Sequence, residues 1–396
     1  MPKVLRIINR FNLGGPTYNA AYLTKYLPSN FETLLVGGMK DDSEDSSQHI
    51  LDSLQITPLI IPEMMRKVNL IYDKEAYNKI YDLIKNFKPD IIHTHASKAG
   101  TLGRLAAYNL KVPVIVHTYH GHVFHSYFNW IKTGFYKAVE RNLAKKSTCI
   151  IAVSDHQKEE LAHEHKICPH QKIRVIPLGF DLDRFNTEVE LKRAKIRTRY
   201  SIGEDEISIG IVGRLVPVKN HTMFLKAIKF VSEHSQKKIK GFIVGDGEER
   251  KNIENTATQL GIKFGNEKDG SYKNSLLIFT SWIKEVDEIN AAMDIIALTS
   301  KNEGTPVSLI EAQACNKPIV TTNVGGIENV VIPGKTALLS EPFDQEKFNL
   351  NLLFMVENDN VRKNFSMRGN EFVKDKFNYK RLVTDMTSLY DNLLHQ

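Results

Sequence analysis

Two glutamates eight residues apart are the side chains that point most directly to a chemical function. Glu303 and Glu311 lie in the segment Glu-Gly-Thr-Pro-Val-Ser-Leu-Ile-Glu. With a helical rise of about 1.5 Å per residue, their carboxylates are expected roughly 10–15 Å apart. That separation exceeds the roughly 5–9.5 Å between the paired carboxylates of glycosidases, and it suits the length of a nucleotide sugar. A capped surface helix with two solvated glutamates is the alternative interpretation.

The residues between these glutamates predict the start of a helix. Thr305 is a good N-cap and Pro306 is favoured at the first helical position. The segment follows Asp294–Leu298, an apolar stretch typical of a buried strand. The first residues of this helix, Thr305 to Val307, would present free backbone amides at the positive end of the helix dipole. Such a helix start favours an anion, and we predict that it binds a diphosphate.

Two cations are predicted to assist the same diphosphate. Arg214 and Lys219 come directly after Gly213, at the end of the predicted strand Ile207–Val212. Fixed positive charges there would stabilise the negative charge that develops when a diphosphate leaves. Two surface charges are the alternative, but the position at a strand end favours the binding role.

Glycine-rich turns are weaker signals. Gly245-Asp246-Gly247 lacks the third glycine of a dinucleotide fingerprint. It is therefore interpreted as a strand-to-helix turn near the nucleotide-sugar donor. Gly14-Gly15 would let the backbone approach a ligand closely, and we predict that Gly15 contacts the diphosphate. A plain tight turn explains Gly14-Gly15 nearly as well.

Closely spaced histidines after the strand Val114–His117 raise the question of a metal site. Residues that alternate along a strand point to opposite faces, whereas metal ligands must converge, so this interpretation is disfavoured. Asp181 and Asp183 are the only tempting Asp-x-Asp pair, and they lie in a linker away from any predicted diphosphate site. No metal site and no cofactor are therefore expected. The set that raised the question is His117, His120, His122 and His125.

Short apolar segments alternate with helical patterns along the whole chain, which predicts parallel sheets. The pattern runs through residues 1–180, pauses near Ile176–Asn186, and then restarts. The fold class is therefore α/β, with two doubly wound domains, an N-terminal one over 1–180 and a C-terminal one over 186–375. Ligands of such sheets bind beyond the carboxyl ends of the strands, and two facing domains would enclose a cleft. The amphipathic segment 379–396 is expected to pack back onto the N-terminal domain.

Composition limits the location and the partners. The first residues are too short and too charged for a signal peptide, and no apolar run approaches the roughly 20 residues of a membrane span. Three widely spaced cysteines fit a reducing cytoplasm. Residues 1–180 carry the whole net charge of +7, which suits an anionic partner or simply a solvated basic face. A nucleic-acid-binding protein is a remote alternative, because no recognition helix, zinc module or RNA-binding motif is present.

Taken together, the motifs resemble family 4 of the glycosyltransferases over nearly the whole chain. The Glu303–Glu311 pair resembles the E-x7-E motif of that family, and Arg214 and Lys219 resemble its diphosphate clamp. Three positions differ from the usual residues: Leu178 replaces Asn, Asn220 replaces Gly, and Asn329 replaces Glu. The matching segments are Gly14-Gly15, Val175–Asp181, Gly213-Arg214-Leu215 with Lys219, Gly245-Asp246-Gly247, Glu303–Ala312, and Asn323–Gly326 with Asn329.

The resemblance implies the GT-B architecture of two facing Rossmann-like domains. It also implies a retaining, metal-independent hexosyltransferase-type enzyme that moves a hexose or N-acetylhexosamine from a nucleotide sugar, with UDP the favoured nucleotide. Glu303 would orient the donor sugar, and Glu311 would bind the ribose. His120, which precedes a glycine as a functional histidine of the family does, would contact the sugar or steady the oxocarbenium-like centre. A nucleotide-sugar epimerase or hydrolase of the same architecture is the nearest alternative.

The basic N-terminal half is expected to present the acceptor, because the donor motifs other than Gly15 all follow residue 200. The predicted helix Asn129–Lys146 combines aromatic and basic residues. The loop Met64-Met65-Arg66-Lys67 combines two methionines, which we expect to be exposed, with two cations. We expect a glycan or polyprenyl-diphosphate-linked acceptor in surface polysaccharide synthesis, and peripheral contact with the inner face of the membrane. A soluble acceptor is the alternative.

Overall fold

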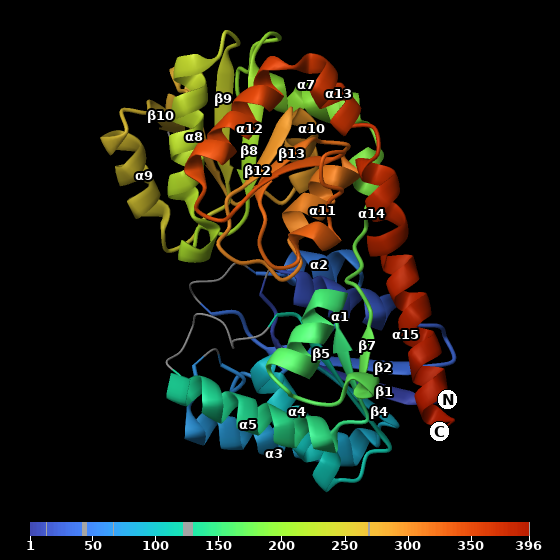
Figure 1. Ribbon diagram of the computed structural model, residues 1–396. Coiled ribbons are helices and arrows are strands. Elements are labelled where there is room, and N and C mark those ends of the chain that lie inside the picture. Colours follow the sequence, from blue (N-terminus) through green and yellow to red (C-terminus); the bar gives the residue numbers. More distant parts are fainter. Residues whose placement is uncertain (13, 42–45, 66, 122–129, 268–269, 396) are drawn as a thin grey trace. The chain divides into compact units, whose positions relative to one another are not determined.

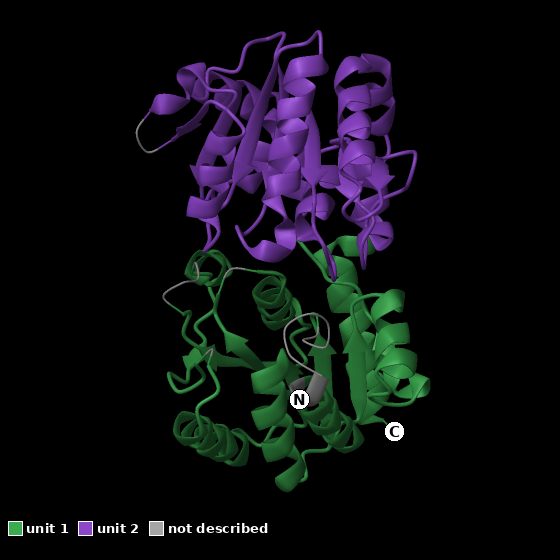
Figure 2. Ribbon diagram, turned by 60° about the vertical axis from the view of Figure 1, so that its left-hand side comes forward, with its two compact units in different colours: residues 1–180, 376–396 green, residues 181–375 purple. Residues whose placement is uncertain are grey.

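The computed structural model describes residues 1–396 except 13, 42–45, 66, 122–129, 268–269 and 396. The chain forms two compact units, which are described separately (Figures 1 and 2). Unit 1 contains Met1–Phe180 and Lys376–Gln396, and unit 2 contains Asp181–Asp375. Each unit contains a seven-stranded, all-parallel sheet with helices packed against it. The predicted α/β class with two Rossmann-like domains is confirmed.

Unit 1 has the strand order β3-β2-β1-β4-β5-β6-β7. Its strands are β1 (Lys3–Arg10), β2 (Glu32–Gly38), β3 (Leu59–Ile60), β4 (Ile91–His95), β5 (Val114–Tyr119), β6 (Cys149–Ala152) and β7 (Ile173–Val175). Its helices are α1 (Gly15–Tyr26), α2 (Gln48–Ser53), α3 (Leu70–Phe87), α4 (Ser97–Asn109), α5 (Trp130–Lys146), α6 (Asp155–Glu159) and α15 (Tyr379–Leu394).

The helices of unit 1 cover both faces of its sheet, as the alternating side chains of β1 show. Val4 packs in a cluster with residues of α1 and α15, whereas its neighbour Leu5 packs with residues of α3 and α4. Successive strand residues point to opposite faces, so α1 and α15 cover one face while α3 and α4 cover the other. The apolar side of α15 is Leu382, Val383, Met386, Leu389 and Tyr390, all buried.

The segment before residue 181 is tied to the C-terminal segment of unit 1. The Phe180 N–H donates to the Phe377 carbonyl at 2.8 Å, and the Tyr379 N–H donates to the Phe180 carbonyl at 3.0 Å. A Cβ on Gly179 would lie 2.6 Å from the Cβ of Leu382, so only glycine allows this approach. The unusual Leu178 is buried, so an apolar residue at this position packs inside the unit.

Unit 2 repeats the pattern with the strand order β10-β11-β9-β8-β12-β13-β14. Its strands are β8 (Ile207–Val212), β9 (Ile239–Val244), β10 (Phe264–Asn266), β11 (Leu277–Ser281), β12 (Ile295–Leu298), β13 (Ile319–Thr322) and β14 (Ala337–Ser340). Its helices are α7 (Val189–Arg199), α8 (His221–His234), α9 (Arg250–Gln259), α10 (Val286–Ala292), α11 (Val307–Ala314), α12 (Gln345–Glu357), α13 (Asp359–Phe365) and α14 (Gly369–Phe377), the last of which crosses into unit 1.

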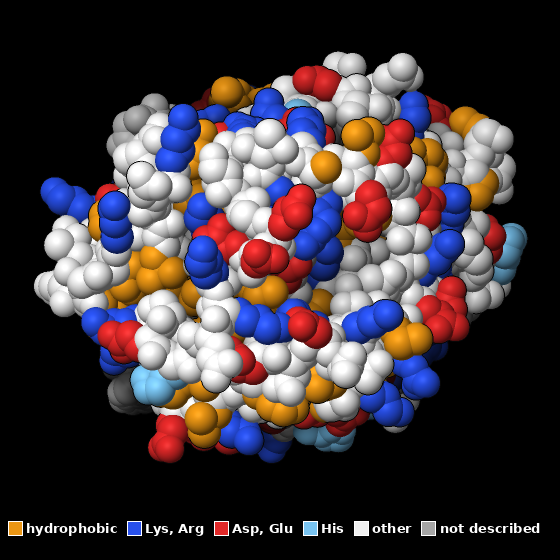
Figure 3. All heavy atoms as spheres, turned by 90° about the horizontal axis from the view of Figure 1, so that it is seen from above, with side chains coloured by type: hydrophobic (Ala, Val, Ile, Leu, Met, Phe, Trp, Pro, Cys, Tyr) orange, Lys and Arg blue, Asp and Glu red, His pale blue; other side chains and the backbone are white. Residues whose placement is uncertain are grey.

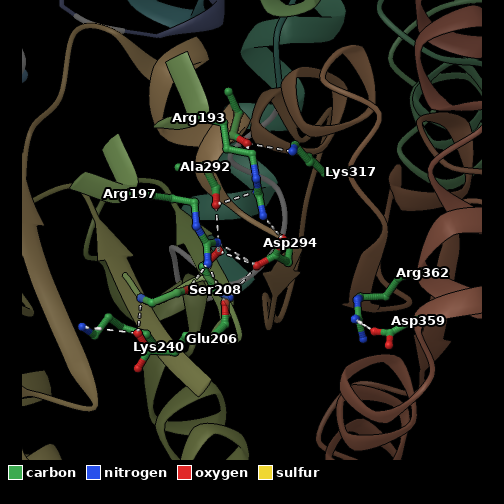
Figure 4. A network of polar contacts seen from close by, with 12 residues as sticks. Arg193, Arg197, Glu206, Ser208, Lys240, Ala292, Asp294, Lys317, Asp359 and Arg362 are labelled. Carbon is green, nitrogen blue, oxygen red and sulfur yellow. Dashed lines mark hydrogen bonds and ion pairs between the residues drawn. The ribbon is translucent and has the colours of Figure 1, made fainter. Parts of the chain in front are cut away.

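A charged network fixes α7 to the amino-terminal edge of this sheet (Figure 4). Asp294, just before β12, accepts from Arg193 at 2.6 Å and from Arg197 at 3.3 Å. The backbone N–H and the hydroxyl of Ser208 each donate to the same carboxylate at 2.8 Å. A partly buried carboxylate with this many donors is fully satisfied, so the network holds the first helix of unit 2 in place.

Figure 3 shows one face of the molecule, on which Lys and Arg side chains are interspersed with Asp and Glu. The basic excess of the chain is therefore not gathered on that face. Among the described residues, no helix is both long and apolar enough to cross a bilayer.

Candidate functional site

Three loops of unit 2 meet at the carboxyl edge of its sheet. They follow β8, β12 and β13, which are neighbours in the sheet. The Thr299 hydroxyl donates to the Lys219 carbonyl at 3.0 Å, and the Lys301 N–H donates to the Val218 carbonyl at 2.8 Å. The Thr322 hydroxyl donates to the Ser300 carbonyl at 2.6 Å. These bonds hold the loops together, at the edge where parallel sheets bind their ligands.

The structure brings Lys219 and Glu303 together. The Lys219 Nζ lies 2.6 Å from Glu303 Oε1, and both side chains are largely buried. The hydroxyl of Ser300 donates to the same oxygen at 2.5 Å. Both bonds engage Oε1, so Oε2 is left without a partner among the described residues. An ammonium has three donors, so Lys219 retains capacity for a second anionic group.

Glycines after β13 allow the Glu303 loop to lie against the backbone. The Gly326 N–H donates to the Glu303 carbonyl at 2.9 Å. A Cβ on Gly325 would lie 2.0 Å from the Glu303 carbonyl oxygen, and one on Gly326 would lie 1.8 Å from that of Gly304. Neither contact is sterically possible. The Gly-Gly pair is therefore required by the close approach of two loops.

Arg214 lies on the β8 loop but makes no side-chain hydrogen bond or ion pair with any described residue, and it is exposed. Its loop packs on the Gly245-Asp246-Gly247 turn, because the Leu215 N–H donates to the Asp246 carbonyl at 2.9 Å. Gly245 has φ +133°, and a Cβ there would lie 2.1 Å from the Gly213 carbonyl oxygen. The turn supports the Arg214 loop through its backbone.

The helix predicted from Thr305 begins later than expected. α11 starts at Val307, with Pro306 at the N-cap position (ψ 97°) and no side-chain cap. The prediction that Thr305 is the N-cap and Pro306 the first helical residue is wrong, because the extended ψ of Pro306 delays the first helical turn. The Leu309 N–H donates to the Pro306 carbonyl at 3.1 Å. The amides of Val307 and Ser308 precede any intrahelical acceptor, so they can donate to an anion at this end of α11.

Glu311 lies on α11, one face of which is buried. The surroundings of Glu311 shift the pKa of its carboxyl group. Burial raises its pKa to about 7, the Arg184 guanidinium opposes this shift, and repulsion from Asp287 adds to it. Asp287 itself pairs with Lys192 at 2.9 Å. A carboxyl with a pKa near neutrality in a polar setting marks a candidate functional residue.

Three histidines of unit 1 lie on one face of its sheet. His93, His95 and His120 share the side covered by α1 and α15, because they alternate with Thr94 and Tyr119. His117 points to the other face, where its Nδ1 lies 2.8 Å from the Thr94 hydroxyl. Of the histidines considered as metal ligands, His117 and His120 thus diverge, and His122 and His125 lie outside the described residues.

His120 contacts a histidine that the sequence reasoning missed. Its Nε2 lies 2.9 Å from the Nδ1 of His95, and the two rings stack with centroids 5.2 Å apart. Burial lowers the pKa of His120 to about 3, so the ring is neutral at physiological pH. The signal was present in His93-Thr94-His95, at the carboxyl end of a predicted strand beside the strand that precedes His120.

Gly15 is the first residue of α1, with Gly14 at the N-cap position and Pro16 in the first turn. The Thr17 N–H donates to the Gly14 carbonyl at 3.1 Å. Gly15 and His120 thus belong to unit 1, whereas Arg214, Lys219, Glu303, Glu311 and the start of α11 belong to unit 2.

An exposed apolar segment precedes and begins α3. Val68, Leu70 and Ile71 are 70%, 85% and 77% exposed. The segment is firmly held, since Asn69 caps α3 by accepting from the Ile71 and Tyr72 amides. The prediction that Met64 and Met65 are both exposed is wrong for Met64, which is fully buried, while Met65 is exposed. Arg66 lies outside the described residues.

Two family models match the chain. The model described as "Glycosyltransferase Family 4" matches residues 13–184, and "Glycosyl transferases group 1" matches residues 192–372. Each match falls largely within one of the two units.

Individual relatives cover most of the chain. It is 31% identical to UDP-Gal:alpha-D-GlcNAc-diphosphoundecaprenol alpha-1,3-galactosyltransferase of Escherichia coli, over 86% of this chain and 84% of the relative. It is 23% identical to the capsular polysaccharide biosynthesis glycosyltransferase CapM of Staphylococcus aureus, over 85% of each. Among solved structures, HepE of Anabaena in complex with UDP and glucose aligns with a TM-score of 0.81 at 17% identity, over 99% of this chain and 100% of that chain.

Proposed function

The chain belongs to glycosyltransferase family 4, and from this premise we propose that it transfers a hexose from a UDP-sugar to a polyprenyl-diphosphate-linked sugar. It is a hexosyltransferase of the GT-B fold that acts in polysaccharide or lipid-linked sugar synthesis. The observation that best supports the proposed transfer from a UDP-sugar is the Lys219–Glu303 pair beside the start of α11. It combines a cation, a carboxylate and helix amides, which are the groups that a sugar diphosphate requires.

The donor is proposed to bind to unit 2. Its diphosphate would lie at the Val307 and Ser308 amides, where Arg214 and Lys219 add positive charge. Glu303 would accept from hydroxyls of the donor sugar through Oε2, while Lys219 and Ser300 hold Oε1. Glu311 would accept from the ribose hydroxyls. UDP-galactose is the first donor to test, because the Escherichia coli relative is named for it.

The proposed reaction retains the configuration of the sugar. The bond between the anomeric carbon and the donor phosphate oxygen breaks, and Lys219, Arg214 and the α11 amides stabilise the charge on the leaving diphosphate. The acceptor hydroxyl forms the new bond from the same face, and its proton passes to the leaving phosphate oxygen. His120 would contact the sugar, and its neutral ring would act through hydrogen bonding. No metal ion is needed in this scheme, since the cations and amides supply the positive charge.

A transfer assay tests this function directly. The purified protein is incubated with UDP-galactose, UDP-glucose or UDP-N-acetylglucosamine and a synthetic diphosphate-linked N-acetylglucosamine lipid, and products are identified by mass spectrometry. We expect a product one sugar longer with one of the three donors, and equal activity in EDTA. Donor consumption without acceptor would favour the epimerase or hydrolase instead. Loss of activity in EDTA that manganese restores would contradict the metal-independent mechanism.

The acceptor lipid is proposed to be met at an anionic membrane surface by unit 1. Val68, Leu70 and Ile71 offer the exposed apolar side chains that interfacial segments insert. Lys67 is exposed beside them. A hollow next to α5 adds further positive charge, as its lining contains Arg141, Lys145, Lys166 and Lys172 and no acidic residue. Each such cation contributes about 1 kcal/mol near an anionic membrane.

Sedimentation with vesicles tests the membrane contact separately. Leu70→Ser with Ile71→Ser should abolish sedimentation with phosphatidylglycerol vesicles, and binding of the unaltered protein should weaken as salt rises from about 50 to 300 mM. Leu191→Ser with Met367→Ser is the matched control, because these two exposed apolar residues lie in unit 2. Equal sedimentation of both double variants would contradict the proposed contact.

A further inference from the structure

We propose that His95 is a positioning residue that fixes the tautomer of His120, so that His120 presents its Nδ1–H as the donor toward the substrate. The inference rests on the proposed function of His120, and it assigns a role to a residue outside the motifs that suggested that function. The contact joins the ends of β4 and β5, which are adjacent in the sheet.

Among the ring nitrogens of His93, His95 and His120, two have no hydrogen-bond partner in the part of the chain that the structure describes. His93 is satisfied on both sides, by the Tyr390 hydroxyl at 2.6 Å and the Thr118 hydroxyl at 2.7 Å. His95 Nδ1 and His120 Nε2 bond to one another. Of the ring nitrogens of these three histidines, the buried ones left without a partner among the described residues are His95 Nε2 and His120 Nδ1. A buried polar atom without a partner in the fold is a candidate for contact with a ligand.

The imidazole rings of His95 and His120 are both neutral. Burial lowers the pKa of His95 well below its usual value, and repulsion from His93, His120, Arg6 and His117 adds to this effect. With both rings neutral, a single proton lies between His95 Nδ1 and His120 Nε2. One ring must donate and the other must accept.

The two possible arrangements differ in what they leave unpaired at His95. If His95 Nδ1 carries the proton, its unpaired Nε2 is a bare acceptor, and His120 Nδ1 becomes an N–H donor. If His120 Nε2 carries the proton, His95 Nε2 becomes a buried N–H donor without a partner. Each arrangement therefore leaves one N–H donor and one bare acceptor unpaired within the fold. The proposal assigns the N–H to His120, because its proposed contact with the sugar supplies an acceptor, whereas the described residues offer none to an N–H at His95 Nε2.

The surroundings hold His95 in this role. Its ring packs between His93, with centroids 4.2 Å apart, and His120. His93 is in turn fixed by Tyr390 of α15. The residue after His95, Ala96, has φ +66° and ψ 165°, a conformation that is costly for a non-glycine residue. Such strain is typical of positions where the surrounding structure fixes a functional side chain.

Two substitutions of His95 distinguish the role of its hydrogen bond to His120 from the role of its size. In His95→Asn the amide nitrogen takes about the place of the imidazole Nδ1 and can still donate to His120. In His95→Asp a carboxylate oxygen takes that place and can only accept, which forces a proton onto His120 Nε2. His117→Asn is the matched control, because His117 is an equally buried histidine on the opposite face of the sheet.

The first readout is the tautomer of His120, measured by nitrogen-15 NMR of histidine-labelled protein with a His120 variant for assignment. We expect the Nδ1–H form in the unaltered protein, in His95→Asn and in His117→Asn, and proton occupancy of Nε2 in His95→Asp. An Nε2–H tautomer in the unaltered protein, or an unchanged tautomer in His95→Asp, would overturn the proposal. This readout does not depend on any transferase activity.

The second readout is steady-state kinetics of hexose transfer. His95→Asp should lower kcat about tenfold or more, as expected for loss of one oriented donor, with the donor KM little changed. His95→Asn should keep kcat within about threefold, since the donor to His120 is preserved. Equal losses in His95→Asn and His95→Asp would show that only the bulk of the ring matters and would refute the role. Failure of the unaltered protein to transfer any hexose would instead contradict the proposed function, while the NMR result still decides the role of His95.

Discussion

At the residue scale, Glu303 is held more tightly than a surface glutamate, since Lys219 and Ser300 share its Oε1. We predict that Glu303→Gln lowers kcat about 10²–10³-fold with a smaller effect on the donor KM, because contacts to the sugar change most at the transition state. Steady-state kinetics against the donor checks this. A variant that raises KM but keeps kcat would place Glu303 in ground-state binding only.

Lys219 and Arg214 differ in their surroundings, so their substitutions should differ as well. Each alanine substitution should cost about 10²–10³-fold in rate if both cations contact the leaving diphosphate. Lys219→Ala should also lower the melting temperature, because it leaves the Glu303 carboxylate with a single donor, whereas the exposed Arg214 has no partner to lose among the described residues. Activity assays with calorimetry measure both effects. Full activity of both variants would contradict the diphosphate clamp.

Glu311 predicts a pH dependence of stability. Its pKa is raised from 4.5 to about 7 in the folded protein, so the folded state holds the proton more tightly than the unfolded chain. The stabilisation is therefore greatest at low pH and is lost as pH rises from about 4.5 to 7, by about 3 kcal/mol at most. Glu311→Gln should be more stable than the unaltered protein at pH 8 and similar at pH 5, as measured by urea unfolding at both pH values.

The same carboxyl predicts how donor binding responds to pH. An ionised Glu311 accepts from two ribose hydroxyls, whereas a protonated one must donate to one of them. The donor KM of the unaltered protein should therefore fall as pH rises through about 7, while that of Glu311→Gln should stay flat over the same range. Parallel pH profiles of the two proteins would place the ribose elsewhere.

At the element scale, the loops after β12 and β13 lie in backbone contact through Gly325 and Gly326. A methyl group on Gly326 would lie 1.8 Å from the Gly304 carbonyl oxygen, so Gly326→Ala must push the loops apart. We predict a fall in kcat of about tenfold or more and a melting temperature several degrees lower. Gly203→Ala is the control, since its nearest atoms would be 3.8 Å away. If both variants behave alike, the loop contact does not position Glu303.

The sequence predicts the long central elements of both sheets better than their edges. The strands at Val114–His117, Ile207–Val212 and Asp294–Leu298 were expected because each is a short apolar run between helical patterns, and they correspond to β5, β8 and β12. The strands at Ile173–Val175, Phe264–Asn266 and Ala337–Ser340 were not expected, as each has only three or four residues and lies at a sheet edge. So few residues carry no periodic pattern, and their pairing depends on the neighbouring strand.

The residues of the candidate site were likewise predicted only in part. Lys219, Glu303 and Glu311 were found from their spacing, because loop and helix residues at strand ends follow local rules. His95 was missed, because its contact with His120 depends on β4 lying beside β5, which spacing alone does not show. The late start of α11 was missed because the extended ψ of Pro306 is a property of the folded loop, whereas proline alone favours the first helical position.

At the scale of the whole molecule, unit 1 is completed by the end of the chain. α15 buries Leu382, Val383, Met386, Leu389 and Tyr390 in the cluster that contains Val4 and Phe31. At about 1.5–3 kcal/mol for each buried side chain, their burial contributes about 8–15 kcal/mol before the entropy cost of ordering the helix, which is large against the net stability of a domain. A chain that ends at residue 375 should therefore lose the cooperative unfolding of unit 1, as judged by hydrogen exchange.

Unit 2 should be less affected by that truncation, because residues 181–375 contain its entire sheet and core. Its amides should keep their protection from exchange, and UDP should still raise its melting temperature if the proposed donor site is correct. Loss of protection in both units would show that the two unfold as one cooperative body.

The return of the chain to unit 1 also has a consequence for its synthesis on the ribosome. Residues 1–180 emerge before unit 2, but the helix that covers one face of their sheet is translated after unit 2. At about 5–20 residues per second, the apolar face waits about 10–40 s for its cover. The second unit can finish folding during that interval, so the order of completion is the reverse of the order of translation. Nascent chains stalled before residue 379 should thus be bound by chaperones that recognise exposed apolar surface.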